Sequence, residues 1–412
     1  MIRKPRSARR AQQPSSLRAV RAFIALALVL AALGLAGTSA SGRASIALAE
    51  TTPTVGETSS SPEPTGTEAS DRPLAGRVSA PSRGAYIGVF RPPAPYQATA
   101  LSAYKTLSGK SASIVMWFQP WAPSGAGRFD AASAIALWNR GAVPLISWEP
   151  WNPGDQPHNL KTPSDMPAWT LAKIGAGDYD AYLTQFARDV KAAGGPVMIS
   201  PFHEMNGCWY PWCGLANGNS PAQFVTAWRH VHDLFEREGA TNVTWVWSVN
   251  FESRPALQVN RFAAYYPGPS YVDWVGVSGF NWGGMGGGPW RSFDKIYKTP
   301  LSYLKTTHKP VVITEIASVE NKGSKAHWLT DTFKRIRTRH PEIKAVIYYD
   351  ALEHGLGHKQ DWRINSSKKS LAAYRAAVKP SAFIGSTPAA LSQWRARLTS
   401  EQWVGLFALR RY

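Results

Sequence analysis

The chain of 412 residues has few of the side chains that build metal sites, with two cysteines and nine scattered histidines. None of them recurs at the spacing of a structural or catalytic zinc site. His203-Glu204 does not begin a zinc-protease motif, because position 207 is glycine and no second histidine follows at the required spacing. We therefore expect no metal and no cofactor.

Long hydrophobic runs are also missing. The longest apolar stretch without a charge, Ala22–Ala36, has fifteen residues, whereas a membrane-spanning helix needs about twenty. It follows seven Lys or Arg with no acid in residues 1–21, and small residues come after it. This pattern predicts a secretory signal peptide within residues 1–49. The alternative is an uncleaved N-terminal membrane segment, so we expect a protein that is secreted or anchored at the cell surface.

Residues 50–83 contain no aromatic residue and are rich in Thr, Ser, Pro, Glu and Gly. Such a segment cannot bury enough surface to offset the entropy lost on ordering. We predict a disordered linker between the N-terminal segment and a folded domain. Residues 381–412, at the other end, have no assignable role; a short helix packed on the domain and a disordered end both fit.

Acidic residues are outnumbered, 27 against 46 Lys and Arg, which gives a formal net charge of +19. The first 21 residues supply seven of these charges, and the remaining bases are scattered along the chain. No stripe of Lys and Arg alternates with aromatic residues on one element, so a nucleic-acid partner is not expected. We interpret the excess as a solvated basic surface on a monomeric protein.

From Tyr86 onward, short apolar runs alternate with helical patterns. The helical stretches include Pro221–Glu238, with Ser220 as N-cap, and Lys325–Arg339. Continuous apolar strands are typical of parallel sheets covered on both faces. Eight alternations predict one α/β domain, a (β/α)8 TIM barrel over residues 84–380. The expected strands are Tyr86–Phe90, Ser113–Phe118, Val143–Trp148, Pro196–Phe202, Val243–Val249, Val272–Val277, Val311–Thr314 and Ala345–Tyr349.

Two carboxylates lie where expected strands end. Glu204 follows strand 4, within the stretch Ile199–Cys213, which also contains Trp209, Tyr210 and Trp212. Glu315 follows strand 7. Active sites of TIM barrels lie at the C-terminal ends of the strands, and a pair of carboxylates is the minimum equipment for cleaving a glycosidic bond. Pyranose rings stack on indole, and eighteen tryptophans favour an aromatic-lined binding surface.

Four motifs carry a resemblance to glycoside hydrolase family 26. They are F-H-E-M-N-G-C-W-Y-P-W at 202–212, T-E-I-A at 314–317, S-W-E-P-W at 147–151 and D-W-R-I-N-S-S at 361–367. The resemblance extends over Tyr86–Lys379. It implies a TIM barrel with the acid/base on strand 4 and the nucleophile on strand 7. It also implies an endo-β-1,4-mannanase or, because S-W-E-P-W looks more like the glucanase members, a mixed-linkage β-1,3-1,4-glucanase; β-1,3-xylanases also occur in the family.

The resulting hypothesis is hydrolysis by double displacement with retention. Glu204 protonates the leaving oxygen and Glu315 forms a glycosyl-enzyme, which requires carboxyl groups about 5–5.5 Å apart. A small disulfide between Cys208 and Cys213 would stiffen the aromatic loop. Sugar-binding roles are expected for residues at or near the strand ends: Trp148, Glu149, His203, Asn206, Trp209, Asn250, Phe280, Trp282, Tyr349 and Trp362.

One residue departs from the family pattern. After strand 6 the family commonly has a tyrosine that hydrogen-bonds the nucleophile, and the residue here is Phe280. Another donor must serve Glu315, or the match is displaced by a residue or two. A non-catalytic cell-surface carbohydrate-binding barrel is the alternative function, although the presence of both carboxylates argues against it. The sequence does not distinguish endo from exo action.

Overall fold

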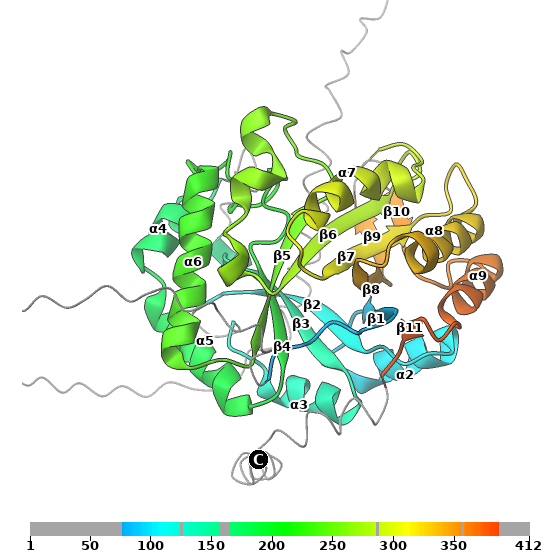
Figure 1. Cartoon of the computed structure of the whole chain (residues 1–412), viewed down its shortest axis with the longest axis horizontal. Helices are drawn as coiled ribbons and strands as arrows, with labels where there is room; N and C mark the ends of the chain where they lie inside the picture. The colour runs from blue at the N-terminus through cyan, green and yellow to red at the C-terminus, as the bar shows by residue number, and fades with distance from the viewer. Residues whose placement is uncertain (1–75, 124–126, 156–164, 286–287, 356–357, 387–412) are drawn as a thin grey trace, which may run out of the picture.

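The structure is a computed structural model, and it describes residues 76–123, 127–155, 165–285, 288–355 and 358–386. The predicted signal segment 1–49 and the chain beyond residue 386 lie outside the described residues. Eight parallel strands form a closed barrel, and helices surround it (Figure 1). The strands are β1 (Ala85–Phe90), β2 (Ile114–Pro120), β3 (Val143–Glu149), β4 (Val197–Pro201), β5 (Val243–Asn250), β6 (Trp274–Asn281), β7 (Val311–Ser318) and β8 (Ile343–Tyr349).

The barrel closes between its first and last strands. β1 pairs with β2 on one side and with β8 on the other, in register from Tyr86↔Ala345 to Phe90↔Tyr349. The predicted (β/α)8 fold is therefore confirmed. The largest boundary differences are at β6 and β7, which end at Asn281 and Ser318. Glu315 thus lies within β7 instead of following it.

The main helices lie between successive strands and bury one face against them. α6 begins with a capping box in which Ser220 and Gln223 each bind the other's backbone amide, and it ends at Gly239, which has a left-handed φ of 72°. These local signals explain why the predicted bounds of α6 and α8 match the structure. The helices are α2 (Ala98–Ser108), α3 (Ala131–Asn139), α4 (Leu171–Ala176), α5 (Asp180–Ala193), α6 (Pro221–Glu238), α7 (Phe293–Lys305), α8 (Lys325–Arg339) and α9 (Lys368–Val378).

A hairpin and a short edge strand complete the fold. The hairpin β9 (Leu352–Gly355) and β10 (His358–Asp361) follows β8 directly. β11 (Phe383–Ile384) pairs with the beginning of β1. The first residues of the C-terminal segment thus extend the sheet beside β1.

The end of the predicted linker belongs to the folded domain. Arg77 binds Glu236 at 2.5 Å and Asp273 at 2.8 Å, and the backbone N–H of Val78 donates to Thr244 Oγ1 at 2.7 Å. Trp274 Nε1 donates to the Val78 carbonyl at 3.0 Å. The boundary predicted at residue 83 is therefore about seven residues too late, because ion pairs with distant residues order a segment whose composition is that of a linker.

Tryptophan serves mainly the core. Thirteen of the sixteen described tryptophans are buried, while Trp209, Trp282 and Trp290 are partly exposed. Trp148 is fully buried and packs on Phe186 with ring centroids 4.4 Å apart. The interpretation of tryptophan content as a binding surface is therefore wrong for most of these side chains, because large rings also fill the layer between barrel and helices.

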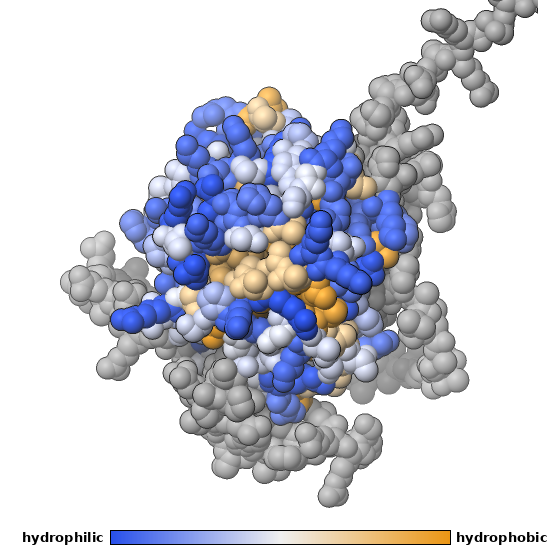
Figure 2. Space-filling model, turned by 90° about the vertical axis from the view of Figure 1, so that its right-hand side faces the viewer, coloured by the Kyte–Doolittle hydropathy of each residue, from blue (hydrophilic) through white to orange (hydrophobic). Residues whose placement is uncertain are grey.

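The outer face of α9 combines exposed basic and apolar side chains. It carries a shallow groove lined by Lys368, Leu371, Ala372, Arg375, Ala376 and Lys379. Figure 2 shows this side of the molecule, where apolar side chains are surrounded by hydrophilic ones. The three basic residues of the groove, Lys368, Arg375 and Lys379, are exposed.

None of the helices in the described part of the chain is both long enough and apolar enough to span a bilayer.

Candidate active site

A tight turn after β4 places Glu204. Phe202 and Glu204 both have a positive φ of 53°, a left-handed conformation that non-glycine residues rarely adopt. The N–H of Glu204 donates to the Ser248 carbonyl of β5 at 2.9 Å, which ties the turn to the neighbouring strand. Backbone strain of this kind is found at functional sites, where the surrounding structure holds it.

The carboxylate of Glu204 is buried, with 7% of the residue exposed, and both of its oxygens have donors. Trp209 Nε1 donates to Oε2 at 2.9 Å. The hydroxyl of Ser278, on β6, donates to Oε1. The partly exposed ring of Trp209 is therefore oriented by its hydrogen bond to the carboxylate of Glu204.

Glu315 lies close to Glu204 on the inner side of β7. Ser278 is its register partner on β6, next to a shift in the strand pairing. The backbone here is fixed by Tyr297 of α7, whose hydroxyl donates to the Gly279 carbonyl at 2.6 Å and lies 3.4 Å from the Glu315 carbonyl. The predicted pair thus comes together through a single intervening serine.

Burial and neighbouring charges perturb Glu315 strongly. Burial raises the pKa of its carboxyl well above the ordinary value, and the charge of Glu204 raises that pKa further. Glu353 and Glu149 act in the same direction, while a hydrogen bond with Ser278 lowers the pKa of Glu315. Strongly perturbed pKa values in a cluster of carboxyls are typical of catalytic sites.

Glu149 and His203, the residue before the acid, form a buried pair. His203 Nε2 lies 3.2 Å from Glu149 Oε1, and Trp151 Nε1 donates to Glu149 Oε2 at 3.0 Å. The His203 ring packs edge-on against Tyr210, with centroids 4.9 Å apart. The structure therefore connects the S-W-E-P-W stretch directly to the residue that precedes the acid.

A further carboxylate, Glu353, comes from the β9–β10 hairpin and was missed in the sequence. It accepts hydrogen bonds from the Tyr349 hydroxyl and from Trp362 Nε1, the latter at 3.1 Å. Burial raises its pKa, and these two bonds lower it. Asp350, which directly follows β8, pairs with Arg91 and accepts from the Ile364 N–H at 2.8 Å.

The partly exposed aromatic rings near these carboxylates include Phe280 and Trp282. Phe280 packs on Tyr349 and Trp362 with centroid distances of 5.3 and 5.1 Å. Trp282 stands at 90° to Trp362 with centroids 5.0 Å apart. Tyr349 and Trp362 themselves are nearly inaccessible, at 5% and 1% exposed.

Three residues expected to bind sugar have other roles in the structure. Trp148 lies between the barrel and α5, where its Nε1 donates to the Tyr182 hydroxyl at 3.2 Å. Asn206 is fully buried, and its amide bonds the N–H and carbonyl of Asn250 at 2.8 and 3.0 Å. The side-chain amide of Asn250 donates to the Glu252 carbonyl at 2.6 Å. Asn206 and Asn250 thus join the loops after β4 and β5.

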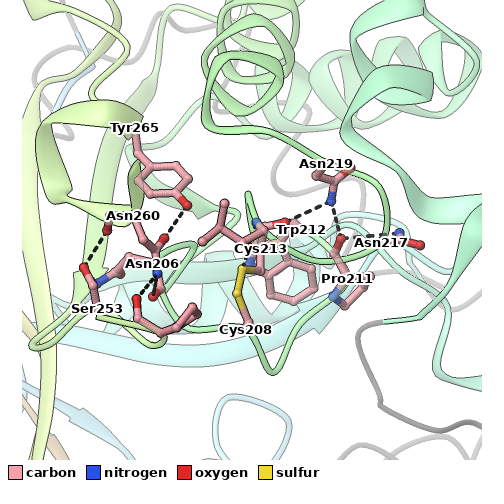
Figure 3. The surroundings of a disulfide bond; sticks show 12 residues. Asn206, Cys208, Pro211, Trp212, Cys213, Asn217, Asn219, Ser253, Asn260 and Tyr265 are labelled. Carbon is pink, nitrogen blue, oxygen red and sulfur yellow. Dashed lines mark hydrogen bonds between the residues drawn. A yellow bond between two sulfur atoms is a disulfide. The ribbon is translucent and has the colours of Figure 1, made fainter. Parts of the chain in front are cut away.

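Cys208 and Cys213 form the predicted disulfide, with sulfur atoms 2.06 Å apart. Figure 3 shows this bond beside the buried Trp212, in a loop held on one flank by Asn206 and Asn260 and on the other by Asn219. Asn260 Nδ2 donates to the Asn206 carbonyl at 3.0 Å, and Asn219 Nδ2 to the Pro211 carbonyl at 2.7 Å. The disulfide and these hydrogen bonds thus hold the aromatic loop that carries Trp209.

Among the described residues, no group of three or more His, Cys, Asp or Glu is arranged to hold a metal ion. The site chemistry that this chain's side chains supply is that of acids, bases and hydrogen-bond donors.

Residues 113–321 match the family model described as glycosyl hydrolase family 26. The chain is 34% identical to endoglucanase H of Acetivibrio thermocellus over 68% of its own length and 29% of that protein. It is 25% identical to a mannan endo-1,4-beta-mannosidase of Bacillus subtilis over 58% of its length and 62% of the relative. The chain thus spans less than two thirds of either relative.

Solved structures share the fold at lower identity. A GH26 beta-mannanase from Bacteroides ovatus superposes with a TM-score of 0.55 and 17% identity, covering 74% of this chain and 91% of that one. A Cellulomonas fimi endo-beta-1,4-mannanase double mutant gives a TM-score of 0.56 and 16% identity, covering 76% and 74%. These likenesses support the barrel architecture.

Proposed function

Because the chain belongs to glycosyl hydrolase family 26, we propose that it is an endo-acting β-glycanase that cleaves a β-linked polysaccharide with retention of configuration. The observation that carries this proposal is the buried pair of Glu204 and Glu315, joined through Ser278. The relatives named endoglucanase and mannan endo-1,4-beta-mannosidase support the same class of reaction.

Glu204 is the general acid and base. It protonates the glycosidic oxygen as the bond breaks, and later removes a proton from the water that releases the product. Glu315 attacks the anomeric carbon and forms the glycosyl-enzyme. Substrate binding displaces water from around both carboxyls, which strengthens each electrostatic contact they make. Trp209 Nε1, 2.9 Å from Glu204 Oε2, holds the acid in place during both steps.

Two polymers are candidate substrates, and a separate observation favours each. The relative with 34% identity is named an endoglucanase, which favours a β-glucan. The 25% identical relative is named a mannan endo-1,4-beta-mannosidase, which favours β-mannan. We place β-glucan first, because the identity to the endoglucanase is higher and that match covers more of this chain. The S-W-E-P-W stretch at 147–151 favours its mixed-linkage form.

The direct test measures reducing-sugar release by the full chain on barley-type β-glucan, β-mannan and xylan in parallel. Glu204→Gln and Glu315→Gln keep the size of each side chain, and we expect each to lose about 10²–10⁴-fold in kcat or more. Proton NMR of the first-formed product reports the anomeric configuration. Product lengths report endo action: medium-length oligosaccharides early in the reaction support it, and release of only the terminal unit contradicts it.

A non-catalytic barrel is the competing function. It predicts binding to one of these polymers in affinity electrophoresis with no release of reducing ends. If the Glu204→Gln and Glu315→Gln variants released as much reducing sugar as the wild type, that result would also contradict the proposed site.

We further propose export of the protein. The basic residues 1–21 and the apolar Ala22–Ala36 support it. Expression of the full chain in a secreting host, followed by intact mass measurement of the protein in the medium, tests this. Loss of roughly the first 49 residues is the expected result, and retention of the whole protein inside the cell contradicts it.

A further inference from the structure

Ser278 occupies a position between the two catalytic carboxyls. It is fully buried on β6, and its hydroxyl donates to Glu204 Oε1. On the other side, its register partner on β7 is Glu315. Phe280, two residues further along β6, has no hydroxyl to offer the nucleophile. Ser278 is therefore the hydroxyl of β6 that is in reach of both carboxyls.

The charges around this hydroxyl oppose ionisation of the Glu315 carboxyl. Two buried carboxyls at close range do not both ionise readily, and such a pair titrates in coupled steps. Burial and the charge of Glu204 raise the pKa of Glu315, and the Ser278 hydrogen bond lowers it. The other titratable groups whose charge interacts with Glu315 come from β3, the loop after β4, α7, β8 and β9: Glu149, Tyr210, Tyr297, Tyr349 and Glu353.

We propose that the Ser278 hydroxyl is a relay that carries one proton between Glu315 and Glu204. In the transfer, the O–H bond of the Glu315 carboxyl breaks as a bond forms from that hydrogen to Ser278 Oγ. At the same time the original Ser278 O–H bond breaks, and its hydrogen bonds to Glu204 Oε1. One proton moves in net terms, the serine ends as a neutral hydroxyl, and no electron pair leaves the three side chains.

This relay gives the enzyme its productive charge state, and the inference rests on the proposed function. Double displacement begins with Glu204 protonated and Glu315 ionised. A polysaccharide bound over the site excludes the water that would otherwise redistribute the proton. A hydroxyl that contacts both carboxyls allows the redistribution to occur beneath the bound substrate, so Ser278 is a positioning residue that acts through the two glutamates.

The first test needs no substrate. The carboxyl carbons of ¹³C-glutamate-labelled full-length protein are titrated by NMR, and Glu204→Gln and Glu315→Gln identify the two resonances. We expect the wild type to titrate in two coupled steps. In Ser278→Ala, the Glu315 step moves to higher pH, because a hydrogen bond that lowers its pKa is lost. Ser278→Thr, which keeps the hydroxyl, moves the step back towards the wild-type position.

Ser248→Ala is the matched control. Ser248 is a buried serine of the neighbouring strand whose hydroxyl bonds Thr314 Oγ1 at 2.7 Å. We expect it to leave the Glu315 step in place. Thermal unfolding of all four proteins shows whether each variant is folded. An unmoved Glu315 step in folded Ser278→Ala, or an equal movement in Ser248→Ala, overturns the relay.

The second test uses turnover. We expect Ser278→Ala to lose roughly 10- to 100-fold in kcat with little change in KM, since a hydrogen bond to a charged group is removed. The acid limb of kcat/KM should move to higher pH, and Ser278→Thr should recover part of kcat. If the wild type is active and Ser278→Ala has the same activity, the relay is refuted and the proposed function is not. An inactive wild type refutes the proposed function. The NMR titration then tests only whether the Ser278 hydroxyl links Glu204 and Glu315.

Discussion

His203 Nε2 and Glu149 Oε1 lie 3.2 Å apart, and both side chains are buried. Trp151 Nε1 donates to the other oxygen of Glu149 at 3.0 Å, and a carboxylate oxygen accepts from His203 when Nε2 carries the ring hydrogen. In Glu149→Gln, the single side-chain oxygen of glutamine replaces two carboxylate oxygens, so it cannot accept from both Trp151 and His203 in the same way. We expect a loss of about 1–3 kcal/mol in the free energy of unfolding, because a buried donor is left without a partner.

Urea unfolding monitored by tryptophan fluorescence measures this loss. The matched control is Glu238→Gln, which neutralises a glutamate that pairs with the exposed Arg188. That pair is solvent-accessible, so we expect a change of less than about 1 kcal/mol. Equal stability losses in the two variants would show that the Glu149–His203 contact contributes nothing specific.

The disulfide gives a second prediction. Cys208 and Cys213 close a short loop that carries Trp209. By the chain-entropy argument, opening such a loop costs roughly 2 kcal/mol of stability. We expect reducing agent to lower both the unfolding free energy and kcat/KM of the wild type, because Trp209 orients the acid. The Cys208→Ser/Cys213→Ser double variant should have the unfolding free energy and kcat/KM of the reduced wild type, and reducing agent should change neither value. The prediction is contradicted if reducing agent changes neither value in the wild type.

The barrel and its two central carboxylates could be predicted because each leaves a local signal. Parallel strands covered on both faces form continuous apolar runs, and helix caps such as Ser220 mark where helices begin. Glu204 and Glu315 stand at or near strand ends, and all such ends of a parallel barrel meet on one face. Periodicity alone was therefore enough to bring residues 111 positions apart into one site.

Residues that depend on long-range contacts could not be predicted in this way. Glu353 reaches the site only because a hairpin follows β8, and its sequence resembles an ordinary loop. Ser278 is one small residue in an apolar strand, distinguished by its register with Glu315. Trp148 alternates to the outer side of β3, so a strand-end position did not place it in the site. Ordering of residues 76–79 depends on ion pairs with Glu236 and Asp273, which no local pattern indicates.

Lys325 is a fully buried cation that ties the beginning of α8 to the chain after the β9–β10 hairpin. Its ammonium donates to the carbonyls of Asp361 and Arg363, at 3.1 and 2.8 Å, and to Ser366 Oγ at 3.0 Å. Burial lowers its pKa to about 8 from the 10.5 of a solvated lysine. The segment so anchored carries Trp362, which bonds Glu353.

The lowered pKa of Lys325 determines how stability changes with pH. Between pH 8 and 10.5 the unfolded chain binds the Lys325 proton and the folded protein does not, so this group's contribution to stability rises with pH in that window. Below pH 8 its contribution is constant. We therefore expect wild type to gain stability relative to Lys325→Met between pH 7 and pH 10, by an amount on the order of 3 kcal/mol.

Urea unfolding at both pH values tests this gain. Lys334→Met, an exposed position on the same helix, should show no comparable pH-dependent difference from wild type. A constant difference between wild type and Lys325→Met at the two pH values would mean that the buried amine does not titrate in this window.

Glu353 offers the sharpest pH prediction. Its charge raises the pKa of Glu315, so Glu353→Gln should lower that pKa and move the acid limb of kcat/KM to lower pH, opposite to the shift expected for Ser278→Ala. The nucleophile and the acid both remain, so activity at the optimum should fall far less than the ~10²–10⁴-fold expected for loss of a general acid. Full pH profiles check this, with Glu236→Gln, which pairs with Arg77, as the control for a remote charge. An acid limb that stays in place in Glu353→Gln, or moves equally in Glu236→Gln, would show that Glu353 does not act on the nucleophile.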